Sequence, residues 1–237
     1  MSSFLSLGRT PRRIAEADSV AVIGLGRFGI SLALELMASG TDVLGVDADE
    51  SIVQSLNGEL TQVVRADSTQ LEVLEQLGIG DFDRVVVSIG SDITASILTA
   101  SLLLQLQVPV IWAKAVDERH ALILDQLGVT HVVRPEADMG RRVAHMVRGA
   151  LEDFIEVEPG YAAARLEVPA SFAAVPLREL GLQVKHGVGI GAVKRDGTWV
   201  LANAETRFEP GDTVLVHGYT GKLEAFAVHW AKQRASA

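Results

Sequence analysis

The sequence lacks two features that point to particular classes of protein: cysteine and a long apolar run. With no cysteine among 237 residues, disulfides, thiolate zinc sites, iron–sulfur clusters and cysteine nucleophiles are excluded, and the absence suits a reducing cytosol. The best apolar stretch, Ile97 to Trp112, is interrupted by Gln105, Gln107 and Pro109. It falls short of the roughly 18 uninterrupted apolar residues that indicate a membrane-spanning helix. We therefore expect a soluble cytosolic protein.

An excess of positive charge is also missing. The chain has 21 basic and 30 acidic residues and a formal charge of -9, and its basic residues cluster only weakly, at Arg9, Arg12 and Arg13. Such a chain repels phosphate backbones, so a general nucleic-acid binder is disfavoured. Hydrophobic residues make up 48% and charged residues 22%, which excludes disorder and fibrous repeats and supports one or two ordered domains. A mean hydropathy of +0.26 suggests buried interfaces between subunits.

Several motifs of enzymes are absent as well. The sequence has no G-x-x-x-x-G-K-[ST] phosphate loop and no G-x-S-x-G nucleophile elbow. None of its six histidines has the spacing of metal ligands. The two tyrosines, Tyr161 and Tyr219, have no lysine four positions later, so the catalytic pair of short-chain dehydrogenases is missing. These absences favour binding without catalysis.

From Ser19 onward, short apolar runs rich in β-branched residues alternate with helical patterns. Such runs are typical of strands buried on both faces of a sheet. The expected strands are Val20–Leu25, Val43–Val46, Gln62–Val64, Val85–Ile89, Val110–Ala113 and His131–Val133. The expected helices are Phe28–Ala38, Glu50–Asn57, Gln70–Leu77, Ile93–Gln107 and Glu118–Leu127. Six strands alternating with five helices predict an α/β fold with a Rossmann-like, doubly wound parallel sheet.

The pattern divides the chain into four parts. Residues 1–17 are interpreted as an N-terminal arm, residues 18–151 as the doubly wound domain, and the acidic segment 152–160 as a linker. Residues 161–237 are expected to form a small α+β domain. Its expected strands are Tyr161–Val168, Val188–Lys194, Trp199–Ala202 and Thr213–His217, and its expected helices Pro176–Leu182 and Leu223–Gln233. Asp196-Gly197 favours a hairpin turn between two of these strands.

The clearest motif is Gly24-Leu25-Gly26-Arg27-Phe28-Gly29, which matches G-x-G-x-x-G between an expected strand and an expected helix. Gly24 permits a tight turn, Gly26 lets backbone approach a phosphate, and Gly29 allows close packing of helix and sheet. The helix N-terminus then offers unpaired N–H groups to an anion. Asp47 lies 18 residues beyond Gly29, at the end of the second strand, where a carboxylate accepts hydrogen bonds from both ribose hydroxyls. The motif predicts nucleotide binding, and the alternative is a Rossmann module that has lost its ligand.

Arg27 supports the same prediction. A cation in the first turn opposes the helix dipole and costs roughly 0.3–1 kcal/mol, which a bound anion would offset. A solvated arginine with no ligand is the alternative.

Five segments resemble those of one known family, the cytosolic RCK (regulator of conductance of potassium) subunits of Ktr/Trk potassium transporters. They are Val22–Gly29, Val46-Asp47, Ala66-Asp67-Ser68, Trp112-Ala113-Lys114 and Arg134–Gly140. The resemblance covers about residues 18–220. It implies an RCK N-terminal (TrkA-N) domain followed by a small TrkA-C domain, and a regulatory protein rather than an enzyme.

The resemblance implies roles for the residues of the first domain. Its Rossmann pocket would bind ATP or ADP, or in some members NAD(H). The segment that includes Phe28 matches the family's glycine loop, and Arg27 matches an arginine that reaches toward the terminal phosphates. Asp47 matches the acid on the ribose, while Asp67 and Ser68 match a segment beside the adenine.

Two further residues have roles only through the resemblance. Lys114 matches a basic residue near the pocket, although its position alone favours a lysine that ends a strand in solvent. Glu136 matches a glutamate that helps, across a dimer, to hold Mg²⁺ or Ca²⁺ near the phosphates. Without the resemblance, Glu136 reads as an acid that stabilises the start of a helix after Pro135.

The resemblance also implies an assembly and partners. Family members form homo-oligomeric rings, typically octamers built from dimers, beneath an integral-membrane subunit of the KtrB/TrkH type. The chain would then be cytoplasmic and attached to the inner face of the membrane through the transporter, and exchange of ATP for ADP would shift the conformation of the ring. Some members bind cyclic di-AMP between C-terminal domains, but Gln183 stands here where those members carry an arginine, which puts that ligand in doubt.

Two alternatives remain open at this stage. An NAD-linked oxidoreductase or redox sensor would share the glycine motif, but it would need a proton-transfer residue that the sequence does not provide. The chain could also be the detached cytosolic domain of a channel, against which we weigh the start at Met1 and the lack of an apolar span. Asp47 disfavours a 2′-phosphate and therefore NADP, but it does not separate ATP from NAD.

Overall fold

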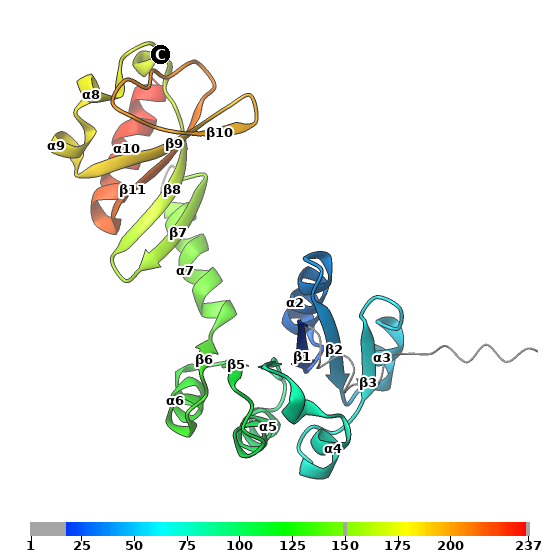
Figure 1. Ribbon diagram of the computed structural model, residues 1–237. Coiled ribbons are helices and arrows are strands. Elements are labelled where there is room, and N and C mark those ends of the chain that lie inside the picture. The colour runs from blue at the N-terminus through cyan, green and yellow to red at the C-terminus, as the bar shows by residue number, and fades with distance from the viewer. Residues whose placement is uncertain (1–17, 149–150, 236–237) are drawn as a thin grey trace, which may run out of the picture. The chain divides into compact units, whose positions relative to one another are not determined.

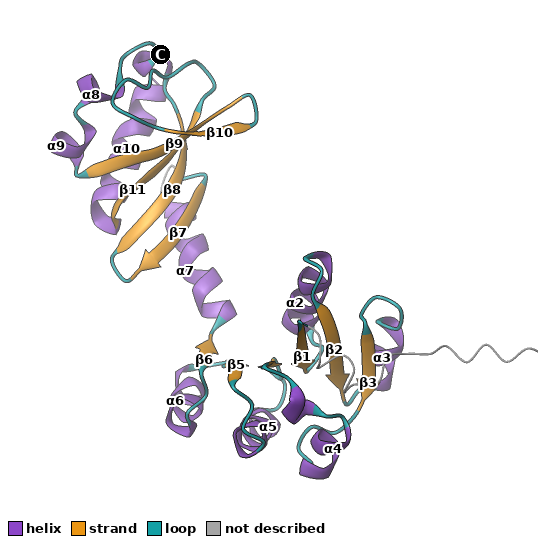
Figure 2. Ribbon diagram, viewed as in Figure 1, coloured by secondary structure: helices purple, strands orange, loops and turns teal. Residues whose placement is uncertain are grey.

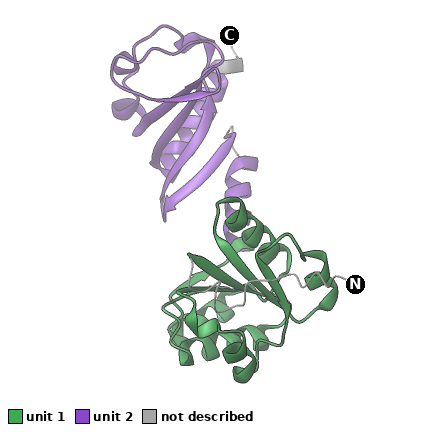
Figure 3. Ribbon diagram, turned by 45° about the vertical axis from the view of Figure 1, so that its right-hand side comes forward, with its two compact units in different colours: residues 1–136 green, residues 137–237 purple. Residues whose placement is uncertain are grey.

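The computed structural model describes residues 18–148 and 151–235. The expected N-terminal arm, residues 1–17, lies outside the described residues. The chain forms two compact units, residues 1–136 and 137–237 (Figure 3). Within the described residues, no helix is both long enough and apolar enough to cross a membrane.

Unit 1 is built around a six-stranded parallel sheet with the strand order β3-β2-β1-β4-β5-β6 (Figures 1 and 2). The strands are β1 (Ser19–Ile23), β2 (Asp42–Asp47), β3 (Gln62–Arg65), β4 (Arg84–Val87), β5 (Val110–Lys114) and β6 (His131–Val133). The helices are α2 (Arg27–Ala38), α3 (Glu50–Ser55), α4 (Leu71–Gln76), α5 (Ile93–Gln105) and α6 (Glu118–Leu127), with a 3-10 turn η1 (Ile79–Asp81). Helix α7 (Pro135–Arg148) starts at the end of unit 1, and most of its residues belong to unit 2. The prediction of a doubly wound parallel sheet is confirmed, and its strand order reverses between β1 and β4.

Alternate residues of each central strand supply the two faces of this sheet. Ala21 and Ile23 pack in a cluster with side chains of α4, α5 and α6, whereas Val20 and Val22 pack in another with side chains of α2 and α3. All four side chains are buried. These strands are therefore buried on both faces of the sheet, as their apolar runs predicted.

Unit 2 is a five-stranded antiparallel sheet with the order β10-β9-β11-β8-β7 and a long helix. Its strands are β7 (Asp153–Glu158), β8 (Tyr161–Glu167), β9 (Val188–Arg195), β10 (Thr198–Leu201) and β11 (Thr213–Tyr219). Its helices are α8 (Leu177–Leu180), α9 (Leu182–His186), α10 (Thr220–Ala235) and the 3-10 turn η2 (Ala170–Phe172). Asp196 and Gly197, at φ 48° and 83°, turn β9 into β10, so the hairpin signal was correct.

Strand β7 occupies the segment that the sequence analysis interpreted as a linker, residues 152–160. It pairs antiparallel with β8, and its Phe154 is 1% exposed. The acidic composition reflects an edge strand with one buried position, Phe154, followed by exposed Ile155, Glu156, Val157 and Glu158. Charged side chains are common on such edges because they discourage pairing with other chains.

Candidate functional site

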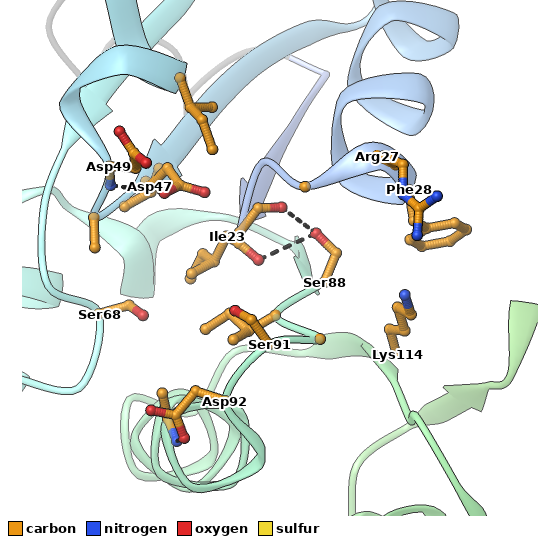
Figure 4. A pocket seen from close by; sticks show the side chains of 18 of the residues that line it. Ile23, Arg27, Phe28, Asp47, Asp49, Ser68, Ser88, Ser91, Asp92 and Lys114 are labelled. Atoms are coloured by element: carbon orange, nitrogen blue, oxygen red, sulfur yellow. Dashed lines mark hydrogen bonds between the residues drawn. The ribbon is translucent and has the colours of Figure 1, made fainter.

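A pocket of about 1420 Å³ lies in unit 1 at the carboxyl ends of the strands, beside the point where the strand order reverses (Figure 4). The register brings these ends level, because Ile23 of β1 is paired with Val46 of β2 and with Val87 of β4. Ligands of open α/β sheets bind at this position. Nine of the residues singled out from the sequence line the pocket: Gly24, Gly26, Arg27, Phe28, Asp47, Asp67, Ser68, Lys114 and Glu136.

The tenth residue, Gly29, lies beneath the pocket and packs the helix onto the sheet. A Cβ atom there would overlap the carbonyl oxygen of Gly24 and lie 2.5 Å from Oγ of Ser88. Gly24 is constrained too, with φ at +91° and a Cβ that would lie 2.8 Å from the backbone nitrogen of Ile89. These two glycines are required by the protein itself, whether or not a ligand is bound.

Gly26 differs, because its φ is -70° and a Cβ there would meet nothing within 4 Å. It is the N-cap of α2, a helix with no side-chain cap and no acidic residue in its first turn. By contrast, α3 and α5 are capped by the carboxylates of Asp49 and Asp92. The first turn of α2 therefore presents backbone N–H groups that no side chain caps, next to open space in the pocket, which suits an anion.

Asp47 has a structural role that the sequence analysis missed. Its carboxylate accepts the backbone N–H of Leu25 in the glycine loop at 2.5 Å and that of Asp49 at 2.8 Å. Each oxygen retains capacity for a further hydrogen bond. Asp47 thus holds the loop in place and can still receive a hydroxyl.

Asp67 and Ser68 line the pocket where the chain leaves β3. Asp67 accepts hydrogen bonds from the backbone and the hydroxyl of Thr69, at 3.0 and 2.6 Å, and from the side chain of Gln70 at 3.2 Å. These bonds hold the pKa of Asp67 below its usual range. The hydroxyl of Ser68 is buried against that of Thr99 at 2.9 Å, so the segment is fixed from beneath.

Lys114 and Glu136 form an ion pair, with Nζ and Oε1 2.6 Å apart. The ammonium also lies 5.8 Å from the centre of the Phe28 ring. The side chain of Lys114 is 11% exposed, while that of Glu136 is 64% exposed, so the lysine is not the solvent-facing strand end that its position suggested. The hydrogen bond from Lys114 lowers the pKa of Glu136, and the nearby Arg27 acts in the same direction.

Charge is unevenly distributed along the pocket. Arg27 and Lys114 lie at one end, and Asp47 and Asp49 at the other (Figure 4). The described residues that line the pocket thus include two cations and five carboxylates, the latter being Asp47, Asp49, Asp67, Asp92 and Glu136. An anion of high charge would therefore bind at the cationic end. A cation bound together with this anion would reduce its repulsion from the carboxylates.

A metal ion in this pocket would need coordinating atoms from the bound anion as well as from the protein. Residues 18–148 and 151–235 contain no group of three or more histidines, aspartates or glutamates arranged to hold a metal. Glu136 is well exposed and offers one carboxylate, the number that Mg²⁺ often takes from protein when phosphates and waters supply the rest.

Sequence reasoning also missed the loop after β4, which lines the pocket through Ser88, Ile89, Gly90, Ser91 and Asp92. The hydroxyl of Ser88 donates to the carbonyl oxygens of Gly24 and, at 3.2 Å, of Ile23. The segment matches no motif. Its place after the strand at which the sheet order reverses was the available signal.

Known proteins are similar to this chain over most of its length. Residues 20–135 match the TrkA-N domain family. The chain is 35% identical to the Ktr system potassium uptake protein C of Bacillus subtilis (strain 168), over 83% of this chain and 89% of that protein. It is 36% identical to the Ktr system potassium uptake protein A of Vibrio alginolyticus, over 86% of this chain and 93% of that protein.

Among solved structures, the RCK domain of GsuK superposes with a TM-score of 0.62 at 20% identity, over 89% of this chain and 47% of that one. The GsuK channel bound to NAD gives a TM-score of 0.63 at 17% identity, over 89% of this chain and 39% of that one. This chain spans less than half the length of these two structures, and the likeness shows the RCK fold.

Proposed function

The chain belongs to the family of Ktr-system potassium uptake proteins that contain a TrkA-N domain, and from this premise we propose that it is a nucleotide-sensing regulatory subunit of a potassium transporter. The proposal is for a binding protein without catalysis, in keeping with this family. The observation that carries it is the polarity of the pocket, with a carboxylate at the end of β2 and two cations beside the uncapped start of α2.

An adenosine phosphate matches this polarity. The ribose hydroxyls donate to Asp47, the base lies beside Asp67 and Ser68, and the phosphates extend toward the first turn of α2. A 2′-phosphate on the ribose would meet the carboxylates of Asp47 and Asp49, so NADP is disfavoured. ATP, ADP and NAD share the part of the molecule that these groups recognise.

Arg27 and Lys114 bind the phosphates in this proposal. Arg27 is exposed, sits on the first turn of α2 and has no ion pair within the described part of the chain. Lys114 is held by Glu136 until a ligand arrives. A phosphate that draws Lys114 away leaves Glu136 free to bind Mg²⁺ or Ca²⁺ together with phosphate oxygens, which also relieves the excess of carboxylates.

Regulation then follows from the phosphate count. A ligand shifts an equilibrium between two conformations only by its difference in affinity for them. ATP and ADP share their adenosine contacts, so groups that contact the γ-phosphate must separate the two states, and Arg27 and Glu136 are the candidates. We assign the chain to a homo-oligomeric ring, an octamer built from dimers, that acts on an integral-membrane KtrB/TrkH-type subunit at the inner face of the membrane.

The cyclic di-AMP ligand of some family members is not part of this proposal. Gln183, the residue that departs from their arginine, is exposed on α9 in unit 2. Whether unit 2 binds a dinucleotide stays a prediction from the resemblance.

Calorimetry of the full chain with ATP, ADP, NAD and NADP tests the proposal, together with potassium flux into vesicles that contain a Ktr-type membrane subunit. We expect binding of ATP and ADP, no binding of NADP, and a flux that differs between ATP and ADP. Binding of NAD alone, with a flux that no adenosine phosphate changes, would favour the redox-sensor alternative.

The cation is tested by Glu136→Gln, which keeps the shape of the side chain and removes its charge. Mg²⁺ or Ca²⁺ should raise the affinity for ATP in the wild type and not in this variant. Glu118→Gln is a matched control, because Glu118 is an exposed acid at the start of a helix and does not line the pocket. An equal cation effect in all three proteins would reduce Glu136 to a helix-start acid.

A further inference from the structure

Beside the loop between β5 and α6, which lines the pocket through Val116, lies a histidine that the proposed function does not use. His120, on the first turn of α6, is 1% exposed. Its Nδ1 accepts the backbone N–H of Val116 at 3.3 Å, and within the described residues its Nε2 has no hydrogen-bond partner. Its own backbone N–H donates to the carboxylate of Asp117 at 2.8 Å. The imidazole is thus bonded through Nδ1 to the short loop between β5 and α6, while the backbone of His120 is bonded to the N-cap residue of α6.

The hydrogen bond from Val116 defines the protonation state of the ring. An N–H group can donate only to a nitrogen that carries no proton, so Nδ1 is bare and the imidazole is neutral. Burial lowers the pKa of His120 because it penalises the charged form, and the carboxylate of Asp117 opposes this shift without overcoming it. The neutral form is therefore the one that this packing supports near neutral pH.

Protonation of His120 would reverse the hydrogen bond to Val116. Both nitrogens of the imidazolium are donors, so Nδ1–H would face the Val116 N–H with no acceptor between them. A buried, unpaired charge and an orphaned backbone donor are both costly. The loop must then move away from the ring, or the ring must leave its site.

This loop is part of the nucleotide pocket. Val116 lines the pocket, and Lys114 stands two residues before it. Both side chains lie against Gly90 on the neighbouring loop, where a Cβ would lie 3.3 Å from the lysine Nζ and 3.7 Å from the valine Cγ1. A displacement of Val116 therefore moves the wall that positions Lys114.

We infer that His120 is a positioning residue for nucleotide binding: in its neutral form it holds the Val116 loop against the pocket, and its protonation weakens the nucleotide site. The inference rests on the proposed function, and it makes pH a second signal to which the nucleotide site responds. With the pKa of His120 below its usual value of about 6.5, the weakening sets in on the acid side of neutrality.

The elements around the ring carry other charged groups, from which the test must separate His120. Helix α5, which packs against α6, carries no titratable residue, since its sequence is ITASILTASLLLQ. The remaining charged or titratable groups on or beside the surrounding elements are Lys114 on β5, His131 and Arg134 on or beside β6, and Asp117, Glu118, Arg119 and Asp125 on or beside α6. His131 is the other histidine on these elements, and its ring is stacked on Trp112 with centroids 4.1 Å apart.

The test compares wild type with His120→Asn, in which the amide oxygen replaces Nδ1 as an acceptor that does not titrate. His131→Asn is the matched control for the second histidine. ADP affinity of the full chain is measured by calorimetry between pH 5 and 8, and each variant is expressed relative to wild type at the same pH, which cancels the ionisation of the ADP phosphates.

We expect His120→Asn to bind ADP like wild type at pH 8. Below the pKa of His120, wild type and His131→Asn should lose affinity relative to His120→Asn by up to about tenfold per pH unit, the limit for one coupled proton. Coincident profiles of wild type and His120→Asn would overturn the inference while leaving nucleotide binding intact. Failure of every protein to bind ADP at pH 8 would overturn the proposed function instead.

A second measurement needs neither ligand nor variant. Hydrogen exchange of the wild-type Val116 amide, corrected for its intrinsic pH dependence, should show more frequent opening on acidification. Constant protection across this range would contradict the inference, even if His120→Asn failed to fold.

Discussion

The three glycines of the motif allow a sharp prediction, because they have different structural roles. In Gly29→Ala the new methyl group would overlap the Gly24 carbonyl and crowd Ser88, and overpacking of this kind costs about 1–3 kcal/mol. In Gly24→Ala the residue would keep a φ near +91° and crowd the backbone of Ile89. The left-handed region costs about 1–2 kcal/mol for residues other than glycine. Both variants should therefore lose stability without any ligand.

Gly26→Ala should behave in the opposite way. Its φ of -70° suits alanine and its methyl group meets nothing, so the reduced entropy of the unfolded chain stabilises the variant by about 0.4–1 kcal/mol. Alanine is a poorer N-cap than glycine, which offsets a similar amount. The net change in unfolding free energy is close to zero. The methyl group nevertheless fills the space in which a phosphate reaches the N–H groups of α2.

Two assays separate these effects. Calorimetric unfolding without ligand should rank Gly26→Ala with wild type and well above Gly24→Ala and Gly29→Ala. Titration with ADP should show a loss of at least about tenfold for Gly26→Ala, because one hydrogen bond to a charged group contributes about 1.5–3 kcal/mol. Normal ADP affinity in Gly26→Ala would refute the placement of phosphates at α2, and a stability loss as large as that of Gly29→Ala would refute the division of roles.

Three further predictions concern single side chains. Arg27→Ala should weaken ATP by about tenfold or more, since a charge-assisted contact is lost, and should spare ADP; equal losses measured by calorimetry would assign Arg27 to phosphates in general. Asp47→Asn should weaken ATP, ADP and NAD alike, through the ribose and through the weaker acceptor that it offers the Leu25 N–H; unchanged ADP affinity would remove Asp47 from the site. Asp212, buried in unit 2, has a pKa lowered chiefly by its hydrogen bonds from Arg195. Its contribution to the free energy of unfolding is therefore complete above its unfolded pKa of about 3.9 and is lost as pH falls through the pKa of the folded state. Asp212→Asn should cost about 1.5–3 kcal/mol in urea unfolding at pH 7, with a difference from wild type that shrinks toward pH 3; a difference independent of pH would contradict the ion pair.

The doubly wound sheet could be predicted because each strand carries a short apolar run and each connecting helix carries its own period. The glycine motif and Asp47 were found for the same reason, as local patterns with fixed spacing. By contrast, Phe154 is one buried residue within an acidic segment, and composition outweighed it. A linker was expected where an edge strand lies, although β7 pairs with the next strand in the sequence, β8, across a turn that contains Gly160 at φ 88°.

Parts of the site depend on contacts between distant segments, which sequence spacing does not contain. Ser88 reaches Gly24 across 64 residues, and Lys114 reaches Glu136 across 22. The contact between His120 and Val116 is local in sequence, but its significance depends on the burial of the ring. Spacing predicted the glycine motif and Asp47, the family resemblance added Lys114 and Glu136, and only the fold shows which of these residues contact one another.

A structure of the full chain with ADP bound tests the central claim most directly. The account predicts ribose hydroxyls on the carboxylate of Asp47, the base beside Ser68, and the diphosphate at the first turn of α2 within reach of Arg27 and Lys114. A nucleotide bound in the reverse direction, or bound outside this pocket, would contradict it.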